Sequence, residues 1–188
     1  KSRCLGCGEC TVACSRKAIS PVSERISIDR EKCVLCENCS RVCPSDALSI
    51  VGKKMQVEEV LAEIEKDMAF YSESGGGVTF SGGEPLLQPD FLKALLTKCR
   101  QRGIHTIVET SGFAPYRVID GVREKVNIFW YDVKIMDDNK HRKYTGASNH
   151  QIVENLKKLA KNGSSVVVSV PIIPRINDDD ENVTKTAE

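Results

Sequence analysis

The sequence lacks a strong net charge and any long apolar run, and both absences limit what the protein can do. Its 188 residues carry a formal net charge of only +1, without a basic stripe interleaved with aromatic residues. Such balance argues against a nucleic-acid-binding surface. No apolar segment is long enough to cross a membrane, and no signal peptide is visible. We therefore expect neither nucleic acid nor a membrane as a partner.

The remaining composition is ordinary, with 40% hydrophobic and 28% charged residues, which suits one or two globular domains. One local cluster, Lys140, His141, Arg142 and Lys143, interrupts the even charge distribution and is expected to be a solvated helix face. The first residue is Lys1 rather than methionine, and the last residues follow an apparent helix start at 178–180. We interpret the sequence as a piece of a longer protein.

Cysteine is the residue type that is not evenly spread. Eight of the nine cysteines lie in the first 43 residues, as two copies of C-x-x-C-x-x-C-x-x-x-C that are 29 positions apart. Structural zinc usually takes paired knuckles with four ligands, and disulfides would spread over the chain and bridge poorly within such short loops. Three thiolates on one tight loop favour an iron–sulfur cluster instead. The expected compartment is a reducing, oxygen-poor cytoplasm.

The spacing resembles that of two-cluster bacterial ferredoxins, with Pro44 completing the second copy. In those proteins the fourth cysteine of each run binds the other cluster. The resemblance therefore implies a ferredoxin-like 2[4Fe–4S] module over residues 1–52, with small strands at 25–28 and 47–51. Its implied ligand sets are Cys4, Cys7, Cys10 and Cys43 for one [4Fe–4S] cluster, and Cys33, Cys36, Cys39 and Cys14 for the other.

Residues 53–188 have a different pattern, in which strands alternate with helices. We expect helices at 57–71, 89–103 and 151–161, a short helix after Pro115, and strands at 78–80, 104–108, 126–133 and 165–170. Cys99 lies on the apolar face of the second of these helices and is expected in the core. Parallel βα units place ligands at the carboxyl ends of their strands. Polar loops follow three of the strands there, at 82–84, 109–111 and 132–134.

The run 75–88, GGGVTFSGGEPLLQ, closely resembles a segment of the activating enzymes of glycyl-radical enzymes, which are radical S-adenosylmethionine (SAM) proteins. The resemblance implies an α/β fold, a partial (β/α) radical SAM barrel with parallel strands. It also implies that Gly82, Gly83 and Glu84 hold the amino group of SAM. The runs 131–134 and 141–146 resemble the family's D-x-K strand end and following helix, which places Asp132 and Lys134 at the SAM site. An ordinary ion pair is the alternative for those two residues.

Two positions of the run 167–178 depart from the family pattern. Ser169 stands where the family has an arginine that contacts SAM, and Arg175 stands where it has a glycine. Glu109 and Thr110 resemble a position that helps to bind a monovalent cation in some members.

The resemblance implies a function for the full-length protein. It would use an electron from a donor such as flavodoxin or ferredoxin to cleave SAM to a 5′-deoxyadenosyl radical, which takes hydrogen from a glycine of a partner enzyme of the formate-lyase or dehydratase type. That chemistry needs a third [4Fe–4S] cluster on a C-x-x-x-C-x-x-C run. This sequence lacks such a run, which in the family lies upstream of the ferredoxin-like module. We therefore expect this chain alone to be inactive. The alternatives are a radical SAM enzyme with auxiliary clusters that acts on another substrate, and a ferredoxin-type electron carrier.

Overall fold

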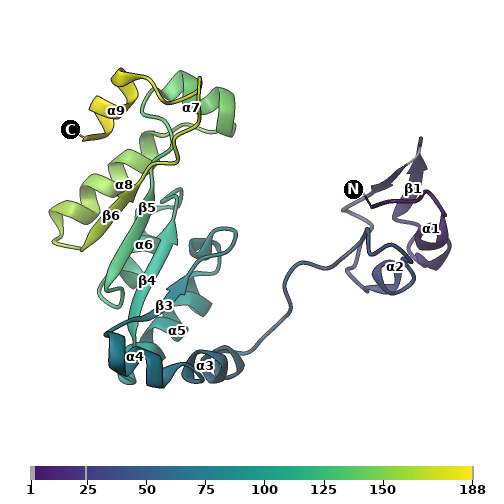
Figure 1. Cartoon of the computed structure of the whole chain (residues 1–188), viewed down its shortest axis with the longest axis horizontal. Helices are drawn as coiled ribbons and strands as arrows, with labels where there is room; N and C mark the ends of the chain where they lie inside the picture. The colour runs from purple at the N-terminus through teal and green to yellow at the C-terminus, as the bar shows by residue number, and fades with distance from the viewer. Residues whose placement is uncertain (1–2, 24, 188) are drawn as a thin grey trace. The chain divides into compact units, whose positions relative to one another are not determined.

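The chain divides into two units, residues 1–54 and 55–188, in a computed structural model that describes residues 3–23 and 25–187. Figure 1 shows the chain coloured from one end to the other, and each unit is described by itself. The first unit contains the eight clustered cysteines, and the second contains the alternating strands and helices.

The first unit repeats its backbone as well as its cysteine spacing. Helices α1 (Glu9–Ala13) and α2 (Asn38–Arg41) begin 29 positions apart, as the cysteines do. Left-handed backbone conformations recur at the same offset, at Gly6 and Leu35, Gly8 and Glu37, and Lys17 and Asp46. A left-handed conformation costs a non-glycine residue about 1–2 kcal/mol, so it persists only where the surrounding structure demands it. The sequence repeat is therefore a structural repeat.

The strand predicted at 47–51 is absent from the structure, whereas the strand predicted at 25–28 is present. In the first copy, β1 (Ile19–Val22) pairs with β2 (Arg25–Ile28) as an antiparallel hairpin. The equivalents of β2 in the second copy are residues 54–57, which instead belong to the segment that connects the two units and to the first residue of α3. Residues 47–51 therefore have no partner strand, and a strand is stable only as part of a ladder.

The second unit is an α/β structure with a parallel sheet, as the sequence predicts. Its four strands follow the order β3-β4-β5-β6, with every neighbouring pair parallel. The elements are α3 (Val57–Glu65), α4 (Met68–Ser74), β3 (Gly77–Phe80), η1 (Pro85–Leu87), α5 (Pro89–Gln101), β4 (His105–Thr110), α6 (Tyr116–Arg123), β5 (Ile128–Asp132), α7 (Asp138–Thr145), α8 (His150–Lys161), β6 (Val166–Ser169) and α9 (Asp180–Ala187). Because the strands are parallel and adjacent, their carboxyl ends meet at one edge.

The predicted helix 57–71 is two helices rather than one. Its first part, α3, buries Leu61 and Ile64 against Cys99 and Ile104, so Cys99 is a core residue as predicted. At the end of α3, the backbone amides of Lys66 and Asp67 bond carbonyls three residues earlier instead of four. This tightened turn ends α3, and α4 starts at Met68.

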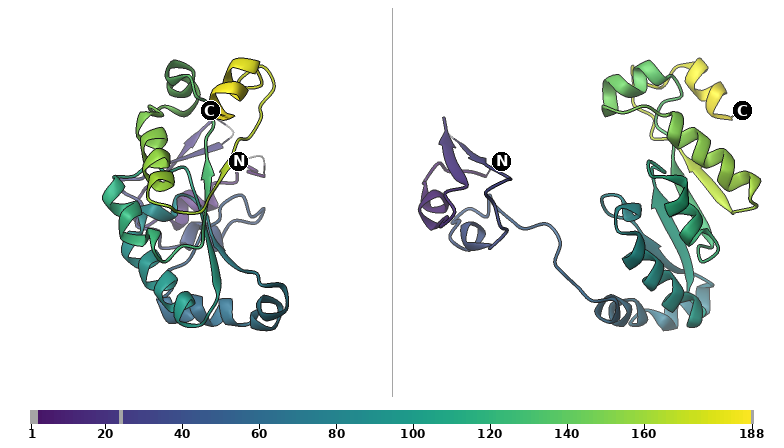
Figure 2. Two further views of the ribbon diagram at one scale, coloured as in Figure 1. Left: turned by 90° about the vertical axis from the view of Figure 1, so that its left-hand side faces the viewer. Right: turned by 180° about the vertical axis from the view of Figure 1, so that it is seen from behind.

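The main core lies between the sheet and helices α5, α6 and α8, which line one side of the sheet when it is seen nearly edge-on (Figure 2, left). Phe129 and Tyr131 of β5 point into this core and are fully buried. Trp130, which alternates with them, is 41% exposed, and its neighbour in the sheet, Val167, is 40% exposed. The unit therefore packs one face of its sheet and leaves the other face open to ligands or other chain segments.

Gly112, just after β4, is fixed by the packing of Tyr131. The phenol of Tyr131 donates a hydrogen bond to the carbonyl of Ile152 at 2.7 Å, and burial raises its pKa. A Cβ at Gly112 would stand 1.7 Å from the Tyr131 hydroxyl oxygen. Since Gly112 also has a φ of 68°, only glycine fits this position without rearrangement.

One prediction about surface charge is wrong in part. In α7, Lys140, Arg142 and Lys143 are exposed, but His141 is only 4% exposed. Its Nδ1 lies 2.7 Å from the carbonyl oxygen of Ala147 and 3.0 Å from the Thr145 hydroxyl. The histidine thus closes the turn after α7 rather than contributing to a solvated face.

Candidate functional site

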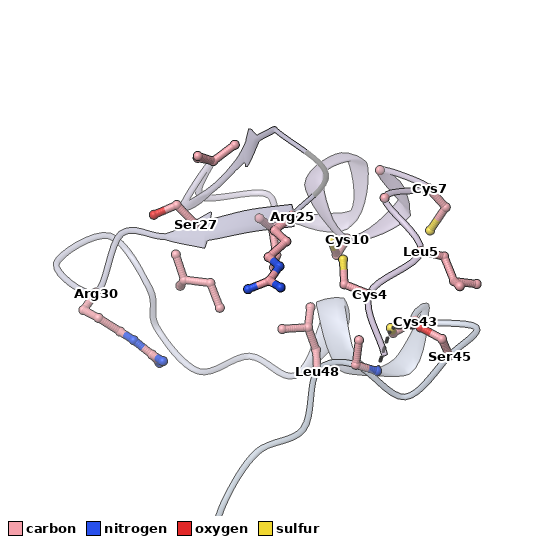
Figure 3. A pocket seen from close by; sticks show the side chains of 16 residues that line it. Cys4, Leu5, Cys7, Cys10, Arg25, Ser27, Arg30, Cys43, Ser45 and Leu48 are labelled. Carbon is pink, nitrogen blue, oxygen red and sulfur yellow. Dashed lines mark hydrogen bonds between the residues drawn. The ribbon is translucent and has the colours of Figure 1, made fainter. Parts of the chain in front are cut away.

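The first group of four predicted ligand cysteines surrounds one cavity. Cys4, Cys7 and Cys10 come from the first copy, and Cys43 comes from the end of the second (Figure 3). The cavity has a volume of about 590 Å³ and lies within the first unit. The structure thus brings together residues separated by more than thirty positions, in the combination that the ferredoxin resemblance implies.

The second group surrounds a smaller cavity of about 30 Å³, lined by Cys33, Cys36 and Cys39 of the second copy and Cys14 of the first. The two copies therefore exchange their fourth cysteine. Among the described residues, no three His, Cys, Asp or Glu side chains converge in a way that would hold a single metal ion. Four thiols spread around a cavity fit a multi-iron cluster better than one tetrahedral zinc ion.

The exchanged cysteines share one further feature. The amide of Ala18 donates to Cys14 Sγ at 3.3 Å, and the amide of Ala47, at the equivalent position, donates to Cys43 Sγ at 3.2 Å. Hydrogen bonds to the sulfur ligands are among the features that set the reduction potential of an iron–sulfur cluster. Hydrogen bonds from the backbone and hydroxyl of Ser45 lower the pKa of Cys43, whereas burial raises the pKa of Cys39.

A separate group of polar residues lies in the second unit, at the carboxyl edge of the sheet. Glu84, in the loop after β3, accepts four hydrogen bonds from its own loop and from the end of β4. Its Oε1 accepts from the Leu86 amide at 3.1 Å and the Thr110 hydroxyl at 2.7 Å. Its Oε2 accepts from the Ser111 amide at 3.1 Å and the Ser111 hydroxyl at 2.8 Å. The carboxylate ties the Gly82-Gly83 turn to the next strand.

Asp132 and Lys134 lie at the same edge, at and just beyond the end of β5. Lys134 Nζ is 3.7 Å from Asp132 Oδ2, with the two side chains 46% and 25% exposed. Between them, the Val133 amide bonds the Ser169 carbonyl at 2.9 Å and so extends the pairing with β6. A half-exposed ion pair of this length is weak, so both groups remain available to a ligand.

Sequence reasoning missed the residues that support this edge. Thr110 and Ser111 were expected near it, but not as the partners of Glu84. Asn177, 1% exposed, donates to the carbonyls of Lys134 at 2.7 Å and Pro171 at 2.8 Å, while its Oδ1 accepts from the Ile173 amide at 2.6 Å. A buried asparagine that satisfies three backbone groups fixes the loop after β6 against the end of β5.

The two departures from the family pattern occupy different surroundings. Ser169 ends β6 directly opposite Asp132, so an arginine there would stand beside the ion pair. Arg175 has a φ of 67°, and its amide bonds Asp178 Oδ1 at 2.8 Å. The family's glycine would adopt this conformation freely, whereas arginine is strained in it.

Replacing Arg175 with glycine should therefore raise the free energy of unfolding by about 0.5–1 kcal/mol, because relief of strain exceeds the extra entropy of the unfolded chain. Denaturant unfolding monitored by circular dichroism would measure it. Gly103→Ala is the converse control, since Gly103 has a φ of 69° and open space around it. It should lower stability by about 1 kcal/mol. A lower stability for Arg175→Gly would show that the side chain makes contacts that outweigh its strain.

Comparison with known proteins gives two family matches. The model described as "Radical SAM superfamily" matches residues 30–187, and the model described as "4Fe-4S dicluster domain" matches residues 3–47. These matches confirm the predicted classes of cofactor, iron–sulfur clusters and SAM, and the predicted class of fold.

Similar proteins are described as activating enzymes. The trans-4-hydroxy-L-proline dehydratase activating enzyme of Clostridioides difficile is 41% identical over 97% of this chain and 61% of its own length. The isethionate sulfite-lyase activating enzyme of Oleidesulfovibrio alaskensis is 44% identical over 98% of this chain and 62% of its own length. A crystal structure of a domain of pyruvate-formate lyase-activating enzyme from Bacteroides vulgatus matches with a TM-score of 0.56 and 36% identity, over 60% of this chain and 70% of that one.

The chain thus spans about three fifths of the length of these curated relatives. Within the described residues, none of the helices has the length and apolar character that a membrane crossing requires.

Proposed function

The chain belongs to the radical SAM superfamily, and we propose that the full-length protein is an activating enzyme of a glycyl-radical enzyme. The observation that carries this proposal is the similarity along nearly the whole chain to proteins described as activating enzymes, at 41–44% identity. It covers the two-cluster module as well as the α/β unit, so the combination of the two units is shared.

When bound, the clusters and SAM supply reductive cleavage to a 5′-deoxyadenosyl radical, which takes a hydrogen atom from a glycine of the partner enzyme. The residues of the chain bind, orient and shield these groups. A flavodoxin or ferredoxin is the proposed electron donor, and the reducing cytoplasm is the proposed compartment. Of the partners, a formate-lyase or dehydratase type fits the names of the relatives.

The proposed SAM site uses the loop of Gly82, Gly83 and Glu84 in a specific way. A carboxylate has about four lone-pair positions, and the four donors from Leu86, Thr110 and Ser111 fill them. Glu84 therefore acts as a positioning residue and as a fixed negative charge. The direct contacts to the methionine ammonium come from backbone carbonyls of the loop, which the two glycines allow a ligand to approach closely.

Asp132 and Lys134 carry the opposite charges that a zwitterionic methionine moiety needs, and they lie at the same strand edge. We propose that their weak ion pair opens when SAM binds. Each side chain is partly exposed, so the exchange costs little.

Two other functions remain alternatives to the proposal. A radical SAM enzyme with auxiliary clusters that acts on a small molecule would cleave SAM without leaving a radical on a protein. A ferredoxin-type electron carrier would not bind SAM at all.

The test uses the full-length protein, reconstituted with iron and sulfide, mixed with SAM, a reductant and candidate glycyl-radical enzymes. Electron paramagnetic resonance should show the doublet of a glycyl radical in one partner, and only when SAM is present. SAM cleavage without a doublet in any partner would favour the small-molecule alternative. If calorimetry detected no SAM binding, the electron-carrier alternative would stand.

A further inference from the structure

The two cysteine-lined cavities differ in the charges around them. Among the residues that the structure describes, the first is lined by two arginines, Arg25 and Arg30, and by no acidic residue. The second is lined by one guanidinium, that of Arg16, and by the carboxylate of Glu37. Glu37 Oε2 also lies 3.7 Å from a guanidinium nitrogen of Arg41, outside the lining. Counted over the described lining residues, the first cavity is thus the more positive.

Figure 3 shows how the first cavity acquires this charge. Arg25 extends from β2 into the space above Leu48, on the side where Cys4 and Cys10 lie, and Arg30 stands at the end of the same hairpin. Neither guanidinium has a hydrogen bond or ion pair to another described residue. Asp29, which precedes Arg30 in the sequence, pairs with Lys32 at 3.0 Å instead.

The asymmetry follows from the point at which the repeat ends. The equivalents of Arg25 and Arg30, 29 positions later, are Lys54 and Glu59. In the second copy the hairpin is missing, and these residues belong to the connecting segment and to α3 rather than to the second cavity. The β1–β2 hairpin lines both cavities, through Ile19 and Ile28 in the second, but among the described residues its arginines line only the first.

Charge of this kind acts on reduction. When a [4Fe–4S] cluster accepts one electron, its net charge becomes more negative by one unit, and a nearby cation stabilises the reduced state more than the oxidised state. Both guanidinium groups are exposed, so solvent weakens their effect but does not remove it.

We propose that Arg25 and Arg30 make the cluster of Cys4, Cys7, Cys10 and Cys43 the more easily reduced of the two, so that the first electron entering the module resides there. The proposal rests on the proposed function, which supplies the clusters. The step is a transfer of one electron from a low-potential donor of the flavodoxin or ferredoxin class. The donor is oxidised, the first cluster is reduced, and no proton or bond is exchanged.

The experiment is a redox titration of the full-length reconstituted protein, monitored by electron paramagnetic resonance. Addition of SAM identifies the signal of the third cluster, because SAM should perturb that signal alone. Arg25→Gln should lower the equilibrium constant for reduction of the higher-potential auxiliary cluster about tenfold, which is about 59 mV for one electron. Arg30→Gln should also lower this equilibrium constant. The lower auxiliary potential should not move in either variant.

Three further variants make the test specific. Arg25→Lys keeps the charge and should keep the wild-type potential. Lys53 lies in the connecting segment and lines neither cavity. Lys53→Gln removes one positive charge there and should change neither potential. Glu37→Gln should raise the lower potential and leave the higher one unchanged.

The proposal is overturned if Arg25→Gln leaves both potentials unchanged, or if it shifts the lower one. Assembly of only one auxiliary cluster in the wild type would also overturn it, and the iron content would reveal this before the titration. Neither result depends on a partner enzyme. Failure of the activase function, by contrast, would appear only as a missing glycyl doublet.

Discussion

Replacing Cys14 with alanine should remove the cluster built on Cys33, Cys36 and Cys39 and leave the cluster of its own copy intact. Cys14 lines the second cavity together with those three residues, although it belongs to the first copy of the repeat. Loss of one of four thiolates should release the cluster, with about four iron atoms. Iron and sulfide analysis of the reconstituted full-length protein measures the loss.

Double substitutions identify the cluster that is lost. Cys14→Ala combined with Cys36→Ala should lose no more iron than either change alone, because both residues serve the same cluster. Cys14→Ala combined with Cys7→Ala should lose about twice as much, since two clusters are then affected. The reverse pattern would show that each copy binds its own four-cysteine cluster. Cys99→Ala is the control, because Cys99 is buried in the α/β unit and should contribute no iron ligand.

Replacing Glu84 with glutamine should weaken SAM binding about 10- to 100-fold, or by about 1.4–2.8 kcal/mol. Glutamine keeps the shape of the side chain but loses its charge. One carboxylate oxygen is replaced by an NH2 group, whose two hydrogens then face groups that donate hydrogen bonds in the wild type. Hydrogen bonds to a charged group are worth about 1.5–3 kcal/mol each, so the loop should loosen. Calorimetry with the full-length protein measures the affinity, and denaturant unfolding of the same variant should show a stability lower by about 2–3 kcal/mol.

Matched variants separate the role of the carboxylate from a general effect of charge. Thr110→Val removes one of the four donors at nearly constant volume and should give a smaller loss of affinity in the same direction. Glu124→Gln makes the same chemical change at the opposite edge of the sheet, where Glu124 follows α6, and should leave SAM binding unchanged. Wild-type affinity in Glu84→Gln would contradict the proposed positioning role.

The elements of the α/β unit could be predicted because each has a local signal. The strand 78–80 is a short run of β-branched and aromatic residues between a glycine turn and a loop, and the helix from Pro89 starts with proline and ends before Gly103. The helix 57–71 was predicted too long because its apolar positions continue at helical spacing through the point where α3 ends. Periodicity reports which side chains are buried, but not a local change in backbone hydrogen bonding.

The missing strand at 47–51 has a similar cause. Its sequence favours a strand, but a strand needs a partner strand to pair with. The residues that follow it belong to the connecting segment and to α3, so they do not form that partner. The repeat of cysteine spacing correctly predicted two equivalent loops, but it could not show that only one copy would keep its hairpin.

For the candidate site, the sequence could predict which strand ends and loops contribute to it, but not the contacts between their side chains. The sequence places polar residues after three strands, and parallel pairing brings those ends together. It does not show that Thr110 and Ser111 bond Glu84, a contact that joins residues 26 and 27 positions apart. Nor does it show that Asn177 supports Lys134 from a loop 43 positions later. Such contacts depend on the folded arrangement of loops, which no local pattern specifies.

The central claim is that the full-length protein transfers the radical to a glycine of a partner protein. The direct measurement uses a partner enzyme whose glycine residues carry deuterium at Cα, incubated with the protein, unlabelled SAM and a reductant. Mass spectrometry of the 5′-deoxyadenosine should then show incorporated deuterium, accompanied by the glycyl signal in the partner. Formation of 5′-deoxyadenosine without deuterium, and without a partner radical, would contradict the account.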